Sequence, residues 1–297
     1  MHLKSRQKPG FFLINISLMR ITIIGIGLIG GSMAIKLKES GFATEIIAVD
    51  NNDDHCRIAL EKGLADQVMT LEDAITISDL IIVAIPVDAT LVLLPRLLSL
   101  INKQAVMDVG STKQMICEAV KDHPKRSRFC ATHPMWGTEY SGPLAATVNA
   151  FSGKAAVICN ALESDGDVLD TVKTLYAGLN MHLVTMDAKA HDVHTAYISH
   201  VSHITSFALA NTVLEKEKED DAIFELASGG FESTVRLAKS NPEMWVPIFE
   251  QNRDNVLDVL NEHISQLKKF KACLEKDNYE YLAALIKNAN SIERIIK

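Results

Sequence analysis

Short apolar runs and helical periodicity alternate along the first part of the chain. Residues 21–24 form a β-branched run that stops at a glycine, which predicts a buried parallel strand. Residues 28–40 carry apolar side chains at helical spacing, and Gly41 closes this segment. Residues 45–49 form a second strand-like run, which ends at Asp50. We therefore expect the order strand, glycine turn, helix, strand from Met19 onward.

The same alternation continues to about residue 110. We expect helices at residues 54–62, 71–77 and 88–100, and strands at residues 67–69, 80–85 and 105–109. Strands that alternate with helices are typical of a doubly wound parallel sheet. We therefore predict an α/β fold for the first domain, which we bound at residues 19–185.

The pattern changes after about Thr185, because no strand-like run follows. We expect helices at residues 188–214, 220–227, 232–238, 242–274 and 279–296, which make residues 186–297 an all-helical domain. Long helices with an apolar face must bury it, so this half is expected to form a homodimer. Residues 1–18 carry basic residues and a short apolar stretch without a small-residue cleavage site, and we expect a disordered extension there.

Composition narrows the class of protein. The net charge of -7 and a pI near 5.8 argue against a nucleic-acid-binding protein. The five cysteines form no C-x-x-C pair, which fits a reducing, cytoplasmic compartment and no structural zinc. No apolar run approaches the roughly 20 residues that span a bilayer, so no membrane partner is expected.

A glycine motif indicates a nucleotide site. Residues 25–30 match G-x-G-x-x-G and follow a predicted strand. The predicted helix begins within this motif, at Leu28 and Ile29. Gly25 would allow the tight turn, Gly27 the approach of a pyrophosphate, and Gly30 the packing of helix on strand. The helix N-terminus offers N–H groups to phosphates, so we expect a Rossmann-type dinucleotide-binding domain.

The residue at the end of the second strand favours one dinucleotide. Asp50 lies 20 residues beyond Gly30, where a carboxylate accepts hydrogen bonds from ribose hydroxyls and repels a 2′-phosphate. Asn51 and Asn52 follow, where an NADP enzyme would more often carry arginine. We therefore expect NAD as the cofactor, with a flavin or another nucleotide as the alternative.

Candidate chemistry lies at the carboxyl ends of the strands, where ligands bind in open α/β sheets. Pro86, residues 108–113 and the segment that starts at His133 occupy such ends. We expect His133 in a loop after a strand, where a neutral imidazole can accept the proton of a substrate hydroxyl as hydride leaves the same carbon. A lone loop histidine is, without context, more often a surface residue.

The helical half adds histidines and one arginine. His200 and His203 lie at i and i+3 on one helix, which also carries His191 and His194. We expect no metal site, because no cysteine or paired carboxylate completes a ligand set. Arg236 follows a glycine-rich turn and could grip a substrate carboxylate through two N–H bonds or form a structural salt bridge.

Taken together, these segments resemble the motifs of the prephenate dehydrogenase family. The similarity covers roughly residues 19–270 in the family's order and spacing, and it is carried by residues 25–32, 108–113, 133–142, 199–203 and 228–245. The resemblance implies that His133 is the general base, that Ser111 contacts the same hydroxyl and orients His133, and that Arg236 binds a carboxylate. It also implies that the pocket is lined by His203, Thr138, Glu139, the backbone of Gly229, and Trp245 near the dimer-related active site.

One departure from the family concerns the rim of the pocket. Glu232 and Ser233 stand where some relatives carry a lysine and an aspartate, so the ion pair of those relatives is expected to be absent. This departure affects how the entrance is gated, not the chemistry.

The resemblance implies an activity and leaves alternatives. The expected reaction is NAD-dependent oxidative decarboxylation of prephenate to 4-hydroxyphenylpyruvate in tyrosine biosynthesis. An arogenate dehydrogenase or a dual-substrate cyclohexadienyl dehydrogenase is the first alternative. A β-hydroxyacid or phosphogluconate-type dehydrogenase would need a catalytic lysine, and Lys189 lacks the surrounding pattern. A regulator that senses NAD without turnover is the alternative from another class.

Overall fold

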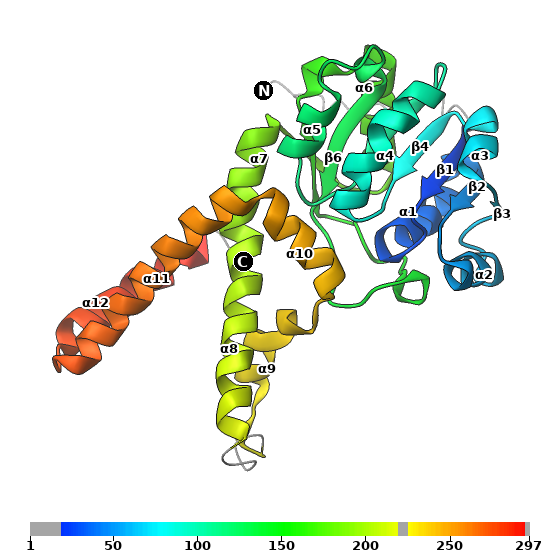
Figure 1. The fold of residues 1–297 in the computed structure, drawn as a ribbon. Helices are drawn as coiled ribbons and strands as arrows, with labels where there is room; N and C mark the ends of the chain where they lie inside the picture. The colour runs from blue at the N-terminus through cyan, green and yellow to red at the C-terminus, as the bar shows by residue number, and fades with distance from the viewer. Residues whose placement is uncertain (1–18, 219–224, 295–297) are drawn as a thin grey trace, which may run out of the picture.

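The computed structural model describes residues 19–218 and 225–294. A body built on one sheet carries helices that project from it (Figure 1). The expected extension at residues 1–18 lies outside the described residues, as does most of the helix expected at residues 220–227.

The body is organised by an eight-stranded sheet with the order β3-β2-β1-β4-β5-β6-β7-β8. The strands are β1 (Met19–Ile24), β2 (Ala43–Val49), β3 (Gln67–Val68), β4 (Leu80–Val83), β5 (Ala105–Asp108), β6 (Phe129–Pro134), β7 (Ala155–Cys159) and β8 (His182–Met186). All neighbouring pairs are parallel except β6 and β7. The first six strands follow the order 3-2-1-4-5-6 of a dinucleotide-binding sheet.

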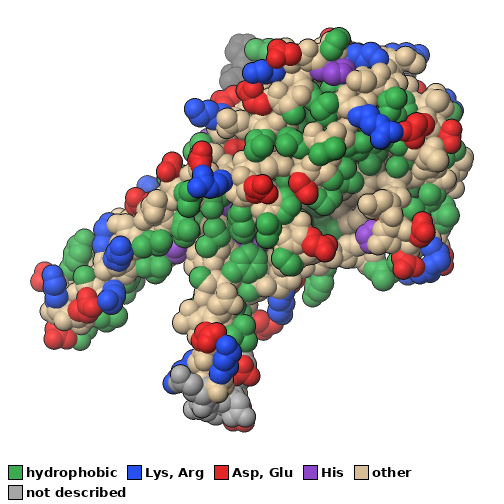
Figure 2. Space-filling view, viewed as in Figure 1, with side chains coloured by type: hydrophobic (Ala, Val, Ile, Leu, Met, Phe, Trp, Pro, Cys, Tyr) green, Lys and Arg blue, Asp and Glu red, His purple; other side chains and the backbone are tan. Residues whose placement is uncertain are grey.

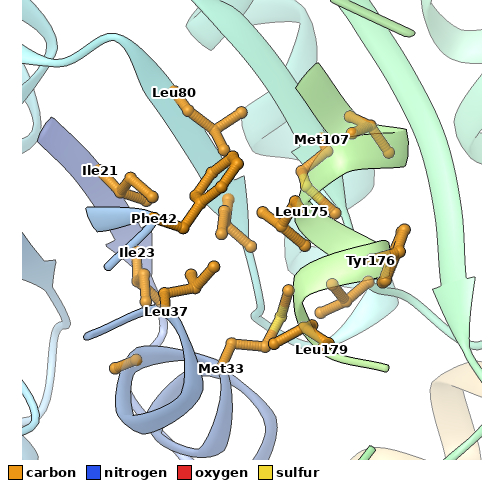
Figure 3. Packing of buried hydrophobic residues seen from close by; sticks show 14 of the residues in the cluster. Ile21, Ile23, Met33, Leu37, Phe42, Leu80, Met107, Leu175, Tyr176 and Leu179 are labelled. Carbon is orange, nitrogen blue, oxygen red and sulfur yellow. The ribbon is translucent and has the colours of Figure 1, made fainter. Parts of the chain in front are cut away.

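Helices cover both faces of the sheet. They are α1 (Leu28–Glu39), α2 (Asp53–Glu61), α3 (Leu71–Ile77), α4 (Val87–Leu100), α5 (Gln114–Val120) and α6 (Gly166–Gly178). Buried side chains of α1 and α6 pack on one face, and those of α3, α4 and α5 pack on the other. Alternation within the strands explains both layers, because Ile21 and Ile23 point to the first face (Figure 3). Ile24 packs with the cluster on the second face.

The sheet extends further than the sequence pattern predicts. Strands β6, β7 and β8 are not among the predicted elements, and β6 includes His133. The expectation that His133 lies in a loop is therefore wrong: it is the penultimate residue of a strand, paired with Val157 of β7. β6 ends at Pro134, and one more backbone bond to the next strand follows, from Met135 N to the Ala155 oxygen at 2.8 Å.

From Ala188 onward the described chain is helical. The helices are α7 (Ala188–Thr195), the π-helical segment η4 (Ala196–His200), α8 (Val201–Glu217), α9 (Gly229–Val235), α10 (Pro242–Gln251), α11 (Arg253–Glu275) and α12 (Tyr279–Asn290). Short 3₁₀ turns are η1 (Arg126–Arg128), η2 (Pro143–Ala145), η3 (Ala161–Glu163), η6 (Arg236–Lys239) and η7 (Ser291–Arg294).

Two predicted helices differ from the structure. The helix expected at residues 188–214 is continuous but contains the π-helical segment, a feature that often lies at functional sites. The single helix expected at residues 242–274 is wrong, because the chain turns at Asn252 between α10 and α11. The Asn252 side chain donates to the backbone oxygen of Asp192 and lies 3.1 Å from His200 Nδ1, which holds this corner against α7 and η4.

The helical half leaves apolar side chains on its surface. Figure 2 shows them gathered where α8, α10 and α11 come together, and α11 and α12 form an arm that points away from the body (Figure 1). Large exposed hydrophobic residues on this arm are Leu257, Ile264, Leu267, Leu274, Tyr279, Tyr281 and Ile286. Within the described residues, no helix is long and apolar enough to cross a membrane.

Candidate active site

The glycine turn between β1 and α1 is shaped by close backbone contacts. Gly25 has φ +92°, and a Cβ there would lie 2.5 Å from the Ala84 carbonyl oxygen. A Cβ on Gly30 would lie 2.1 Å from the Gly25 oxygen, whereas one on Gly27 would meet open space. No side chain caps the N-terminus of α1, which begins at Leu28 and Ile29. The first backbone N–H groups of α1 therefore have no side-chain acceptor and are available to a phosphate group.

Asp50 lies beside this turn, at the carboxyl end of β2. Its Oδ2 accepts a hydrogen bond from Ile26 N at 3.0 Å, and its Oδ1 accepts one from Asn52 N at 2.9 Å. His55 Nδ1 lies 3.5 Å from the same carboxylate, whose side chain is only 8% exposed. Pro86 follows β4 and caps α4 at the same edge of the sheet. The carboxylate is thus held in one position next to the phosphate cradle, as a ribose-binding group requires.

Asp108 organises the next strand end. Its Oδ2 accepts hydrogen bonds from Lys113 Nζ and from Gly110 N, the latter at 2.9 Å, and its Oδ1 accepts one from Thr132 N at 3.1 Å. The side chains of Asp108 and Lys113 are both fully buried. One carboxylate therefore joins the loop that carries Ser111 to the strand that carries His133.

His133 lies at the carboxyl end of β6 and is half-buried. Its Nδ1 is 2.9 Å from His191 Nε2, and within the described part of the chain its Nε2 has no hydrogen-bond partner. Burial holds the pKa of His133 well below its ordinary value of 6.5, and the positive charge of the nearby Lys113 lowers it further. The ring is therefore neutral and keeps one nitrogen available for a ligand.

Ser111 is half-buried in the loop after β5. It forms no hydrogen bond with His133 in the described structure. The ring of His133 is hydrogen-bonded to His191 instead. Sequence reasoning placed His191 on the correct helix but gave it no role. Its one local signal is the adjacent Asp192, which accepts from His191 Nδ1 at 2.7 Å.

The two histidines singled out on the long helix have different surroundings. His203 stacks on Trp245 with ring centroids 3.5 Å apart, and its Nδ1 donates to the Ser199 oxygen at 3.0 Å. Burial lowers the pKa of His203 and brings that of His200 to about 4. His200 is buried against Trp245 and Asn252, whereas His203 remains partly exposed.

Arg236 connects the two halves of the chain. Its Nη1 donates to Glu139 Oε2 at 2.9 Å, and the arginine is 49% exposed while the glutamate is 12% exposed. Its charge also lowers the pKa of His203, and the turn η6, which begins at Arg236, packs against α8. Thr138 Oγ1 accepts from Tyr140 N, and residues 139–141, 144 and 145 line an open hollow of about 580 Å³. Gly229 begins α9 and faces open space.

The site residues predicted from the sequence thus fall into two groups in the structure. The first lies at the carboxyl edge of the sheet, with the glycine turn, Asp50 and His133. The second joins Glu139, Arg236, His203 and Trp245. No group of three or more histidine, cysteine, aspartate or glutamate residues suited to a metal occurs in residues 19–218 and 225–294.

A doubly wound sheet of this order, with an open phosphate cradle and a neutral histidine at the same edge, defines the class of nucleotide-dependent dehydrogenases. Two family models match the chain: the prephenate dehydrogenase nucleotide-binding domain at residues 33–185 and the prephenate dehydrogenase dimerization domain at residues 187–288. The chain belongs to the prephenate dehydrogenase family.

Individual relatives agree with this membership. Prephenate dehydrogenase of Bacillus subtilis is 32% identical over 91% of this chain and 74% of its own. The structure of Aquifex aeolicus prephenate dehydrogenase in complex with hydroxyphenyl propionate and NAD+ has a TM-score of 0.86 at 26% identity, covering 95% of this chain and 99% of that one. Synechocystis arogenate dehydrogenase has a TM-score of 0.74 at 27% identity, covering 94% of this chain and 100% of that one. The predicted fold class and family are thereby confirmed.

Proposed function

We propose that the protein catalyses the NAD-dependent oxidative decarboxylation of prephenate to 4-hydroxyphenylpyruvate. The observation that carries this proposal is the neutral His133, whose free Nε2 lies at the edge of the sheet that holds the glycine turn. A relative that is 32% identical over 91% of the chain bears the same activity in its name.

The proposed cofactor fits the cradle at the glycine turn. The backbone of Gly25, Gly27 and Gly30 and the free N–H groups of α1 would hold its pyrophosphate, and Asp50 would bind a ribose. Pro86 would lie beside it at the end of β4. When bound, NAD supplies an acceptor for the hydride that leaves the ring carbon bearing the hydroxyl.

The side chains of this protein would accept the hydroxyl proton and bind a substrate carboxylate. His133 Nε2 accepts the hydroxyl proton as the ring carbonyl forms, and Ser111 hydrogen-bonds the same oxygen. The carbonyl then receives electrons through the ring as the bond to the carboxylate breaks, which releases carbon dioxide and leaves an aromatic phenolate. The phenolate takes back the proton held by His133 and becomes the phenol. Arg236 binds a substrate carboxylate. The pocket would be completed by His203, Thr138, Glu139, Gly229 and Trp245.

Replacing Arg236 with glutamine is expected to weaken substrate binding. Loss of a charged hydrogen bond costs about 1.5–3 kcal/mol, so KM for prephenate should rise about 10- to 100-fold while kcat changes less. Steady-state kinetics measure both constants. Arg253→Gln, which removes another exposed arginine from the helical half, should leave KM unchanged. An unchanged KM in the Arg236 variant would assign that residue to the Glu139 ion pair alone.

Replacing Asp50 with serine is expected to relax the preference for NAD over NADP. The carboxylate repels a 2′-phosphate, and its loss should raise the NADP/NAD ratio of kcat/KM by about tenfold, or 1.4 kcal/mol. The measurement is kcat/KM for each dinucleotide at saturating prephenate. A wild-type enzyme that already prefers NADP would contradict this role of Asp50.

The substrate itself is tested by comparing prephenate and arogenate side by side, with NAD and with NADP, through the absorbance of the reduced nicotinamide. A higher kcat/KM with prephenate supports the proposal. The likeness to Synechocystis arogenate dehydrogenase makes arogenate the second candidate, and a higher kcat/KM with arogenate would replace prephenate by it.

The proposed assembly is a homodimer through the helical half. The matched dimerization domain covers residues 187–288, and the projecting α11 and α12 carry exposed aliphatic and aromatic side chains. A second copy would bury these side chains. Sedimentation equilibrium measures the mass, and a monomer at micromolar concentration would contradict this proposal.

A further inference from the structure

We infer that His191 and Asp192 determine which nitrogen of His133 carries the proton, so that Nε2 is kept as the catalytic base. This inference rests on the proposed function. His191 and Asp192 would act through His133 without touching substrate, so they are positioning residues.

The direction of the hydrogen bonds is set at Asp192. Its carboxylate accepts backbone N–H bonds from Lys113 and Gln114 at the start of α5, both at 2.8 Å. An ionised carboxylate can only accept, so His191 Nδ1, 2.7 Å from Asp192 Oδ1, must be the donor. Asp192, His191 and Lys113 are buried, which excludes water as a competing partner for the carboxylate.

The tautomer of His191 in turn fixes the tautomer of His133. A neutral imidazole has one N–H, so with Nδ1 of His191 protonated its Nε2 can only accept. His133 Nδ1, 2.9 Å from that nitrogen, must therefore be the donor. The lone pair of His133 then lies on Nε2, the nitrogen with no partner in the described structure. The opposite tautomer would point an N–H at the substrate hydroxyl and could not accept its proton.

Burial and the charge of Lys113 favour the neutral state of His133. If both were protonated, two N–H groups would face each other across 2.9 Å. Lys113 and His200 also act on His133, and Lys113 is paired with Asp108. When Nε2 accepts a proton, the Nδ1–H of His133 remains bonded to His191. The new positive charge therefore keeps a hydrogen-bond acceptor that is itself fixed by Asp192.

The inference is tested by two substitutions at one position. His191→Leu removes the acceptor, and His191→Gln can place Oε1 where Nε2 lies. We expect His191→Leu to lower kcat about 100-fold, within the range for loss of general-base catalysis, with KM changed less than about threefold. Without its acceptor, the protonated form of His133 is less stable, so the acidic limb of kcat/KM should move to lower pH. His191→Gln should restore kcat to within about tenfold of wild type. It should also return the acidic limb of kcat/KM to its wild-type pH.

The matched control is His194→Gln. His194 lies one turn further along α7, is exposed and has no hydrogen bond in the described structure, so its replacement should change neither kcat nor the pH profile. Equal losses in both His191 variants with an unmoved acidic limb would overturn the inference and leave His191 a purely structural role. Unchanged kcat in His191→Leu would overturn it as well.

A measurement on the wild-type enzyme without substrate decides the point even if the variants do not fold. Two-bond ¹⁵N–¹H correlation spectra of histidine-labelled protein report the tautomer of each ring, and loss of a signal set in His133→Asn assigns it among the 10 histidines. The inference expects Nδ1–H and a bare Nε2, and Nε2–H would overturn it. This result is independent of substrate, so a protein that oxidises neither prephenate nor arogenate would refute the proposed function separately.

Discussion

Replacing His133 with asparagine is expected to lower kcat by about 10²–10⁴-fold while KM for prephenate changes little. The range is that of general-base assistance, which the shorter amide cannot provide because it does not accept a proton at neutral pH. The carboxylate contacts proposed for Arg236 remain, so ground-state binding should persist. Steady-state rates at saturating NAD, with KM from the same titration, measure the split between the two constants.

The pH dependence gives this prediction a second readout. Burial lowers the pKa of His133, so the ring stays in its neutral, active form until the pH falls below that lowered value. The acidic limb of kcat/KM should therefore lie well below pH 6.5, and His133→Asn should abolish it. His123→Asn, in the surface turn before β6, is the control and should keep both the rate and the limb. A His133 variant with wild-type kcat would remove this residue from the mechanism.

Replacing Lys113 with methionine is expected to destabilise the protein by about 3–5 kcal/mol, because it leaves the Asp108 carboxylate as an uncompensated buried charge. Both side chains of the pair are fully buried, so no water can take the place of the ammonium group. Urea denaturation followed by circular dichroism measures the free energy of unfolding. Activity should fall too, since Asp108 also fixes Gly110 and Thr132 on either side of the site.

Two further variants make this prediction specific. Lys36→Met breaks an exposed pair with Glu39 and should cost less than about 1 kcal/mol. Combining Lys113→Met with Asp108→Asn should cost less than the sum of the two single changes, because the neutral amide needs no counter-ion. Additive losses would show that the two groups do not stabilise each other.

Much of the first domain could be predicted because its signals are local. The run at residues 21–24, the glycine turn and Asp50 lie within about 30 residues, and each has its own chemical reason. Strands β6 to β8 were missed because they form the far edge of the sheet, where β8 is largely exposed and β7 runs antiparallel to β6. Their pairing depends on contacts between distant segments that no short window of sequence contains.

The site shows the same division between local and distant signals. His133 and Arg236 were found through their surrounding motifs, but the loop assigned to His133 was wrong because the pairing with Val157 is non-local. The partner of His133 lies 58 residues away, and the partner of Arg236 lies 97 residues away. The corner at Asn252 was missed for a related reason, since helical periodicity continues through it and only the contacts to Asp192 and His200 turn the chain.

With the role proposed for Arg236, its ion pair with Glu139 makes this glutamate an internal competitor for the substrate carboxylate. An incoming carboxylate would share the guanidinium with Glu139 or displace it, so part of the attraction it would otherwise gain is already taken by an internal anion. Under that proposal the glutamate would lower the affinity for a carboxylate ligand and would speed its release. Removing the internal anion should therefore tighten the hold on ligand and slow its departure together.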